Sequence, residues 1–101
     1  MIALVNVQIV LSVLALVADW RQTLRIFAPG SRWRELNPAI NWMVGRFGAP
    51  TGVHLWFGMV CVLFGVAVAL LKPEPRLWLA VATAAIEGYW VLHNLRKGIS
   101  L

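Results

Sequence analysis

Four polar side chains could do chemistry within this largely apolar chain, and Glu87 is the most informative of them. It lies about ten residues into the apolar run 77–95, which is about 15 Å deep and close to the bilayer midplane if that run crosses a membrane. A charge there costs about 2.5–3.5 kcal/mol on insertion scales. Such an acid could bind a proton or an ion, contact a pigment or substrate, or form a hydrogen bond between helices. One acid alone makes no relay, which favours the packing interpretation.

The other three polar residues, Asp19, His54 and His93, fall near one common end of the predicted spans. Carboxylate and imidazole groups suit transition metals, and a histidine could also ligate a haem or chlorin. However, no two potential ligands lie three or four residues apart on one predicted helix. We therefore expect polar caps and hydrogen-bonded packing here, with no metal and no cofactor.

The composition identifies the kind of molecule that must position these groups. The 101 residues are 60% hydrophobic and only 13% charged, whereas soluble domains are about 45–50% apolar and about 25% charged. A soluble chain of this size would expose much apolar surface, and a disordered one would contain few aliphatic residues. We find no nucleophile arrangement, glycine-rich phosphate loop or paired catalytic carboxylates. A single membrane domain over 1–101 follows, and an enzyme is not expected.

The pattern along the chain predicts an all-α polytopic membrane protein with three transmembrane helices. The spans cover about 2–26, 53–71 and 77–95, since about 20 helical residues cross a hydrocarbon core of about 30 Å. Asn37 and Pro38 form a helix-start signal for a short helix over about 38–47. That segment is too short to cross the bilayer, so an interfacial or re-entrant helix is predicted. The tryptophans lie near the predicted span ends, as in an aromatic belt.

Small residues recur every four positions on the second and third apolar runs and suggest where helices pack. They are Cys61, Gly65 and Ala69 on the second run, and Ala80, Ala84 and Gly88 on the third. Such small-xxx-small faces allow two helix backbones to approach closely. In the third run, the cost of placing Glu87 in the membrane nearly cancels the favourable insertion free energy of the apolar residues. We therefore expect it to insert with the second run as a hairpin partner.

The basic residues indicate an orientation. The formal net charge is +5; in a soluble protein this could suggest nucleic acid, but here it fits anionic lipid headgroups, and no nucleic-acid partner is expected. With three spans, the first loop and the C-terminal tail share one side, which carries Arg21, Arg25, Arg32, Arg34, Arg46, Arg96 and Lys97. The opposite side carries Lys72 and Arg76. The positive-inside rule places the N-terminus outside and the C-terminus in the cytoplasm of a bacterial inner membrane.

Two short motifs resemble a domain-of-unknown-function family of small prokaryotic membrane proteins. The stretch from Asp19 to Thr23, followed by Glu35-Leu36-Asn37-Pro38, is similar to its D-x-x-x-T … E-L-N-P pattern over roughly residues 6–71. That family often has Lys where His54 stands here. The resemblance implies the topology above and no activity. In physical terms, Asn37 and Pro38 begin the short helix, and Glu35 could pair with a neighbouring arginine.

These observations lead to one expected function and two alternatives. The first is a non-enzymatic packing or accessory subunit of a homo-oligomer or a larger membrane complex. The second is a phage-type holin or other pore former, because the chain's size and predicted orientation resemble those of one class of holin. The third is a subunit of an ion- or proton-handling or cofactor-binding membrane complex that uses Glu87 with His54 or His93.

Overall fold

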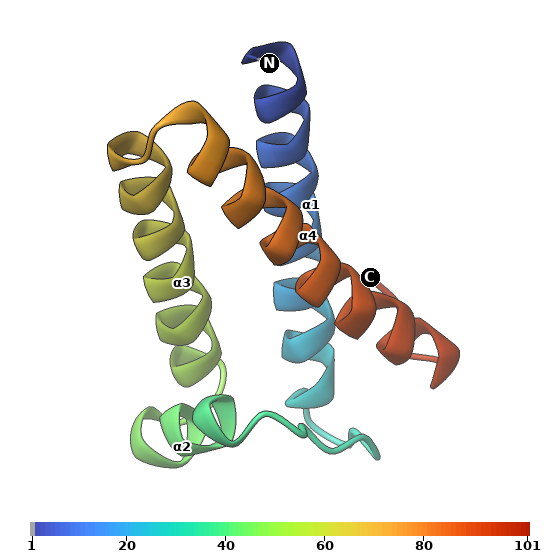
Figure 1. The fold of residues 1–101 in the computed structure, drawn as a ribbon. Coiled ribbons are helices and arrows are strands. Elements are labelled where there is room, and N and C mark those ends of the chain that lie inside the picture. The colour runs from blue at the N-terminus through green and yellow to red at the C-terminus, as the bar shows by residue number, and fades with distance from the viewer. Residues whose placement is uncertain (1) are drawn as a thin grey trace.

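The chain folds into four α-helices and short connections. The structure is a computed structural model, and it describes residues 2–101. The helices are α1 (Ile2–Ile26), α2 (Pro38–Phe47), α3 (Thr51–Leu70) and α4 (Pro73–Arg96). In Figure 1, α1 and α3 run roughly side by side, α2 lies across one end, and α4 starts beside the far end of α3 and crosses α1 obliquely. The all-helical prediction is confirmed.

Two helices, α1 and α3, are long and apolar enough to cross a membrane. Helix α4 has 24 residues and is long enough to cross a membrane, but it is not apolar enough by the measure that α1 and α3 meet. Glu87, His93 and Asn94 interrupt its apolar residues. The predicted third membrane span is thus not supported. The parts of the prediction that hold are the all-helical fold and two candidate spans.

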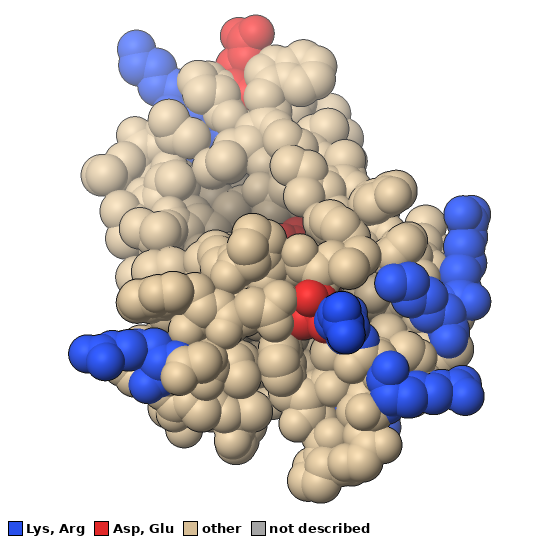
Figure 2. Space-filling view, turned by 90° about the horizontal axis from the view of Figure 1, so that it is seen from below, with Lys and Arg blue, Asp and Glu red and all other residues tan. Residues whose placement is uncertain are grey.

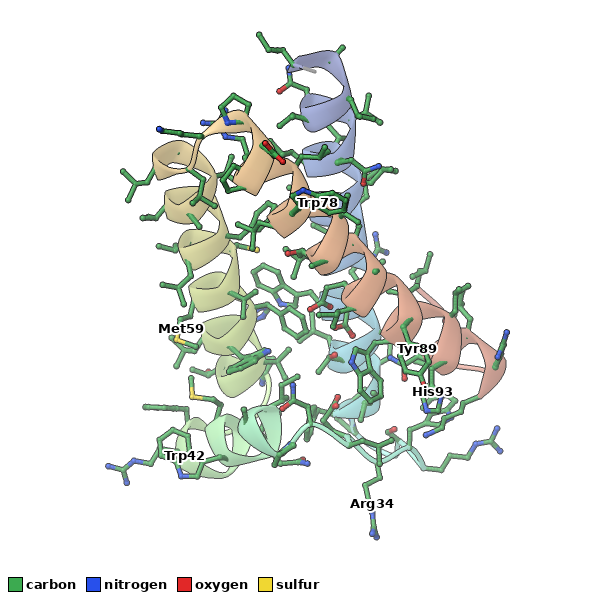
Figure 3. All side chains as sticks on the ribbon, in the orientation of Figure 1. Arg34, Trp42, Met59, Trp78, Tyr89 and His93 are labelled. Atoms are coloured by element: carbon green, nitrogen blue, oxygen red, sulfur yellow. The ribbon has the colours of Figure 1, made fainter. Side chains whose placement is uncertain are left out.

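Local signals explain why α2 begins and ends where it does. The Asn37 side chain accepts a hydrogen bond from the backbone N–H of Ala39 at 2.9 Å, and Pro38 occupies the first helical position. Gly48 ends the helix with a φ of +81°, in the left-handed region that glycine adopts without strain. Trp42 of α2 is exposed (Figure 3).

The turn between α2 and α3 brings their backbones together at one glycine. A Cβ atom built on Gly52 would lie 2.5 Å from the carbonyl oxygen of Met43. Just beyond it, Val53 and Phe57 of α3 are buried with Ile40 of α2. This small core, against which Trp20 of α1 also packs, joins three helices at the α2 end of the molecule.

Helix α4 packs along α1 and barely contacts α3. The hydroxyl of Ser12 donates to the backbone oxygen of Ala80 at 2.6 Å, and both residues are fully buried. A Cβ atom added to Gly65 or Gly88 would meet nothing within 4 Å. The expected hairpin packing of the second apolar run on the third is therefore wrong, because small residues permit a close approach without specifying the partner.

The remaining residues of the two predicted packing faces have other surroundings. Cys61 and Gly65 border an apolar groove whose opposite wall is α1. Ala69 is exposed, while Ala84 is half-buried.

Candidate functional site

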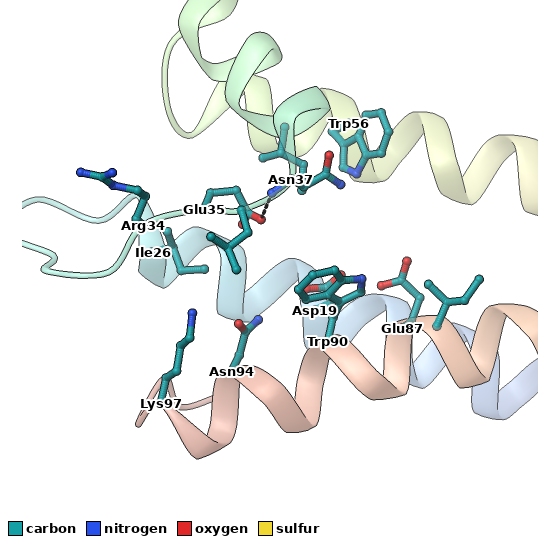
Figure 4. A pocket seen from close by; sticks show the side chains of 13 residues that line it. Asp19, Ile26, Arg34, Glu35, Asn37, Trp56, Glu87, Trp90, Asn94 and Lys97 are labelled. Carbon is teal, nitrogen blue, oxygen red and sulfur yellow. Dashed lines mark hydrogen bonds between the residues drawn. The ribbon is translucent and has the colours of Figure 1, made fainter.

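A cavity of about 120 Å³ lies between α1, α3, α4 and the segment before α2. Figure 4 shows Asp19 and Glu87 at one end of it and Lys97 at the other, with Asn94 between them along α4. Its polar lining comprises Asp19, Glu35, Asn37, Glu87, Asn94 and Lys97, together with the stem of Arg34. Figure 3 shows the Arg34 side chain directed away from the body of the molecule. The cavity therefore concentrates carboxyl groups beside two indoles, Trp56 and Trp90.

The carboxyl groups of Asp19 and Glu87 come close together from α1 and α4 at one end of the cavity (Figure 4). The Thr23 hydroxyl lies one turn away and donates to the backbone oxygen of Asp19 at 2.8 Å and to its Oδ1 at 3.5 Å. Oε2 of Glu87 is buried, and no donor side chain or backbone N–H among residues 2–101 reaches it. Ionised carboxylates only accept hydrogen bonds, so two of them side by side offer acceptors and no donor.

Basic side chains do not neutralise this carboxyl pair. Within the described chain, no Lys, Arg or His nitrogen lies within 4.0 Å of a carboxylate oxygen of Asp19, Glu35 or Glu87. Two adjacent like charges in a poorly solvated site cannot both persist without a counter-ion. A proton or a cation between the two carboxyl groups would relieve this repulsion.

Glu35 lies in the segment before α2 and has mainly a local structural role. Its Oε1 accepts the backbone N–H of Asn37 at 2.9 Å, and its backbone oxygen accepts the Asn41 amide at 2.8 Å. Burial raises the pKa of the Glu35 carboxyl above its usual range, and the Asn37 N–H opposes part of that rise. Glu35 and Asn37 of the E-L-N-P motif thus shape the start of α2 and also line the cavity.

A buried hydrogen-bond network holds α4 on α1 beside the cavity. Gln22 is fully buried, and its amide donates to the backbone oxygens of Val91 at 3.2 Å and Ile99 at 3.4 Å. The Asn94 amide donates to Oε1 of Gln22 at 3.2 Å. This bond directs the amide nitrogen of Asn94 toward α1. This network is not predicted from the sequence, where its signal is a polar amide residue in each of two helices, Gln22 and Asn94.

The two histidines lie apart from the carboxyl pair. The Trp20 indole N–H donates to Nδ1 of the exposed His54 at 3.1 Å. His93 stacks on Tyr89 with ring centroids 6.0 Å apart and meets Trp90 edge-on at 5.7 Å. Asp19, His54 and His93 therefore do not meet, and residues 2–101 contain no cluster of three His, Cys, Asp or Glu side chains that could hold a metal ion.

No protein family, curated protein or solved structure matches this chain. The resemblance of the D-x-x-x-T and E-L-N-P motifs to a family of small membrane proteins therefore stays a prediction.

Proposed function

We propose that this chain is a small integral membrane subunit that reversibly binds a proton or a small cation at the Asp19–Glu87 carboxyl pair. The observation that carries the proposal is the contact of two carboxyl groups from different helices, in a cavity where no basic side chain pairs with them. Near Glu87 in the sequence there is no second acid that could form a relay with it. Asp19 supplies that second acid.

The arrangement of the helices supports a membrane position for the pair. Helix α4 begins where α3 ends and runs back along α1, so it re-enters the layer that α1 and α3 would cross (Figure 1). Its polar residues Glu87 and Asn94 lie on the side that faces α1 and the cavity, whereas Trp78, Tyr89 and Leu92 are exposed. In this proposal α4 enters the bilayer as a partner of α1, which shields the polar groups that a lone span would expose to lipid.

The charge distribution supports one orientation. Figure 2 views the molecule from the end where α1 stops and α2 lies, and Lys and Arg side chains gather around that end. Because basic residues are retained on the cytoplasmic side, the proposal places this end in the cytoplasm of a bacterial inner membrane, with the N-terminus outside.

Infrared spectroscopy of the purified protein in lipid tests proton binding directly. A protonated carboxyl group has a carbonyl stretch that a carboxylate lacks. We expect one such signal at neutral pH that is absent from the double variant Asp19→Asn/Glu87→Gln and unchanged in Glu74→Gln, which alters the exposed acid at the start of α4. An identical signal in the double variant, or none in the wild type, would refute proton sharing by this pair.

A second candidate function, as a packing subunit, is favoured by the groove between α1 and α3. This apolar groove of about 210 Å³ is bordered by Ile9, Val13 and Leu16 of α1 and by Cys61 and Gly65 of α3. A helix from another copy or another membrane protein could fill it. The mass of the protein in mild detergent tests this: an oligomer that a bulky Gly65→Leu change dissociates supports it, and a monomer contradicts it. Abrupt loss of membrane potential on expression would instead favour the pore-forming alternative.

A further inference from the structure

The cavity presents the acceptor oxygens of two carboxyl groups at one end. Oε2 of Glu87 is buried without a donor, and the Asp19 carboxyl lies beside it. Figure 4 shows these side chains lining the same space. A primary ammonium group has three N–H donors and no acceptor, so it matches this set.

The size and walls of the cavity favour an organic cation over a bare ion. Its volume of about 120 Å³ compares with about 10–15 Å³ needed for one water on the same measure. Two indoles, Trp56 and Trp90, line it together with the apolar side chains of Ile40 and Ile86. Indole faces attract cations more strongly than other aromatic rings, and apolar walls suit a carbon skeleton.

The basic residue at the opposite end of the cavity does not occupy the Asp19–Glu87 pair, so the pair is available to a ligand. Figure 4 shows Lys97 at the end of the cavity away from Asp19 and Glu87. No Lys, Arg or His nitrogen among residues 2–101 comes within 4.0 Å of the Asp19 or Glu87 carboxylate. A ligand cation therefore has no built-in competitor at the pair except the shared proton.

From these observations we propose that the cavity binds a primary ammonium group carried by a small organic molecule, with Asp19 and Glu87 as acceptors. This inference rests on the proposed cation-binding function and names its ligand class. The ligand enters as R–NH₃⁺, and the proton shared by the two carboxyl groups leaves to solvent, so one positive charge replaces another. The ammonium group could belong to a free amine or to the headgroup of phosphatidylethanolamine.

Titration of the detergent-solubilised full chain with ethylammonium chloride, followed by calorimetry, tests the inference. We expect saturable binding of one equivalent, with loss of the protonated-carboxyl infrared signal. Tetramethylammonium has no N–H donor and should bind at least 10-fold more weakly, a comparison that needs no variant. Glu87→Gln should weaken ethylammonium binding at least 10-fold, whereas Glu74→Gln should leave it unchanged.

The outcomes separate the two proposals and the two sources of the ligand. If ethylammonium does not bind while the protonated-carboxyl signal persists in the wild type, the ligand assignment fails and proton binding stands. Equal binding of tetramethylammonium would also overturn the assignment. In nanodiscs, weaker ethylammonium binding with phosphatidylethanolamine than with phosphatidylcholine would identify the lipid headgroup as an occupant. Equal binding in both would identify a free amine.

Discussion

Replacing Gln22 by Met should destabilise the α1–α4 interface by more than the hydrogen bonds that Gln22 itself donates would suggest. The change keeps a long, flexible side chain and removes both the donor and the acceptor. The amide of Asn94, which is only 8% exposed, would then lose its partner on α1, at a cost of about 1–3 kcal/mol for an unsatisfied buried group. Two further bonds from Gln22, at 3.2 and 3.4 Å, are longer than average and contribute toward the lower end of about 0.5–1.5 kcal/mol each. We expect a loss of about 2–4 kcal/mol in the free energy of unfolding.

A double-mutant cycle with Asn94→Leu isolates the contact between the two side chains. Removing both partners leaves neither amide unsatisfied, so the double variant should be more stable than the sum of the single losses implies, by about 1–3 kcal/mol. The assay is unfolding in mixed micelles followed by tryptophan fluorescence. Losses that add within about 0.5 kcal/mol would show that Gln22 and Asn94 do not interact, and would refute the packing of α4 on α1 described above.

Three further predictions concern the α2 end of the molecule. Gly52→Val should cost about 1–3 kcal/mol in unfolding experiments, because a side chain there would meet the Met43 carbonyl; an unchanged midpoint would contradict the close approach of the two helices. Asn37→Ala should cost about 0.5–2 kcal/mol through loss of the helix cap, while Asn37→Asp should retain most of the stability; equal losses would exclude capping. Burial raises the pKa of Glu35 in the folded state, so its contribution is fully present below the unfolded pKa and is lost as pH rises through the folded pKa. Glu35→Gln should therefore be more stable than the wild type at pH 8 but not at pH 4, and a difference that does not change with pH would contradict this.

Local signals predicted part of the fold well. Asn37 followed by Pro38 fixes the first turn of a helix through a side-chain bond to the backbone, and the short helix occurs over the predicted residues. The first apolar run also coincides with α1. The start of α2 and the extent of α1 both depend on residues that are close together in the sequence. Residue types alone are therefore enough to predict them.

The pairing of helices depends on distant contacts, and sequence patterns were insufficient there. Ala80 belongs to a small-residue face, but that face accepts a bond from Ser12 of α1 instead of packing on α3. The same α1–α4 crossing brings Asp19 to Glu87. The sequence indicates both Asp19 and Glu87 as candidates, but it gives only the depth of each residue along its predicted span. On depth alone, Asp19 groups with the two histidines.

The contact between Asp19 and Glu87 is the claim on which the proposed function depends, and disulfide crosslinking in native membranes tests it most directly. The variant Asp19→Cys/Glu87→Cys in a Cys61→Ser background, in which no other cysteine remains, should form an intramolecular disulfide rapidly under mild oxidation. The comparison is Ala84→Cys with the native Cys61, which represents α3–α4 packing and should crosslink slowly. Rapid crosslinking of the second pair and none of the first would contradict the account.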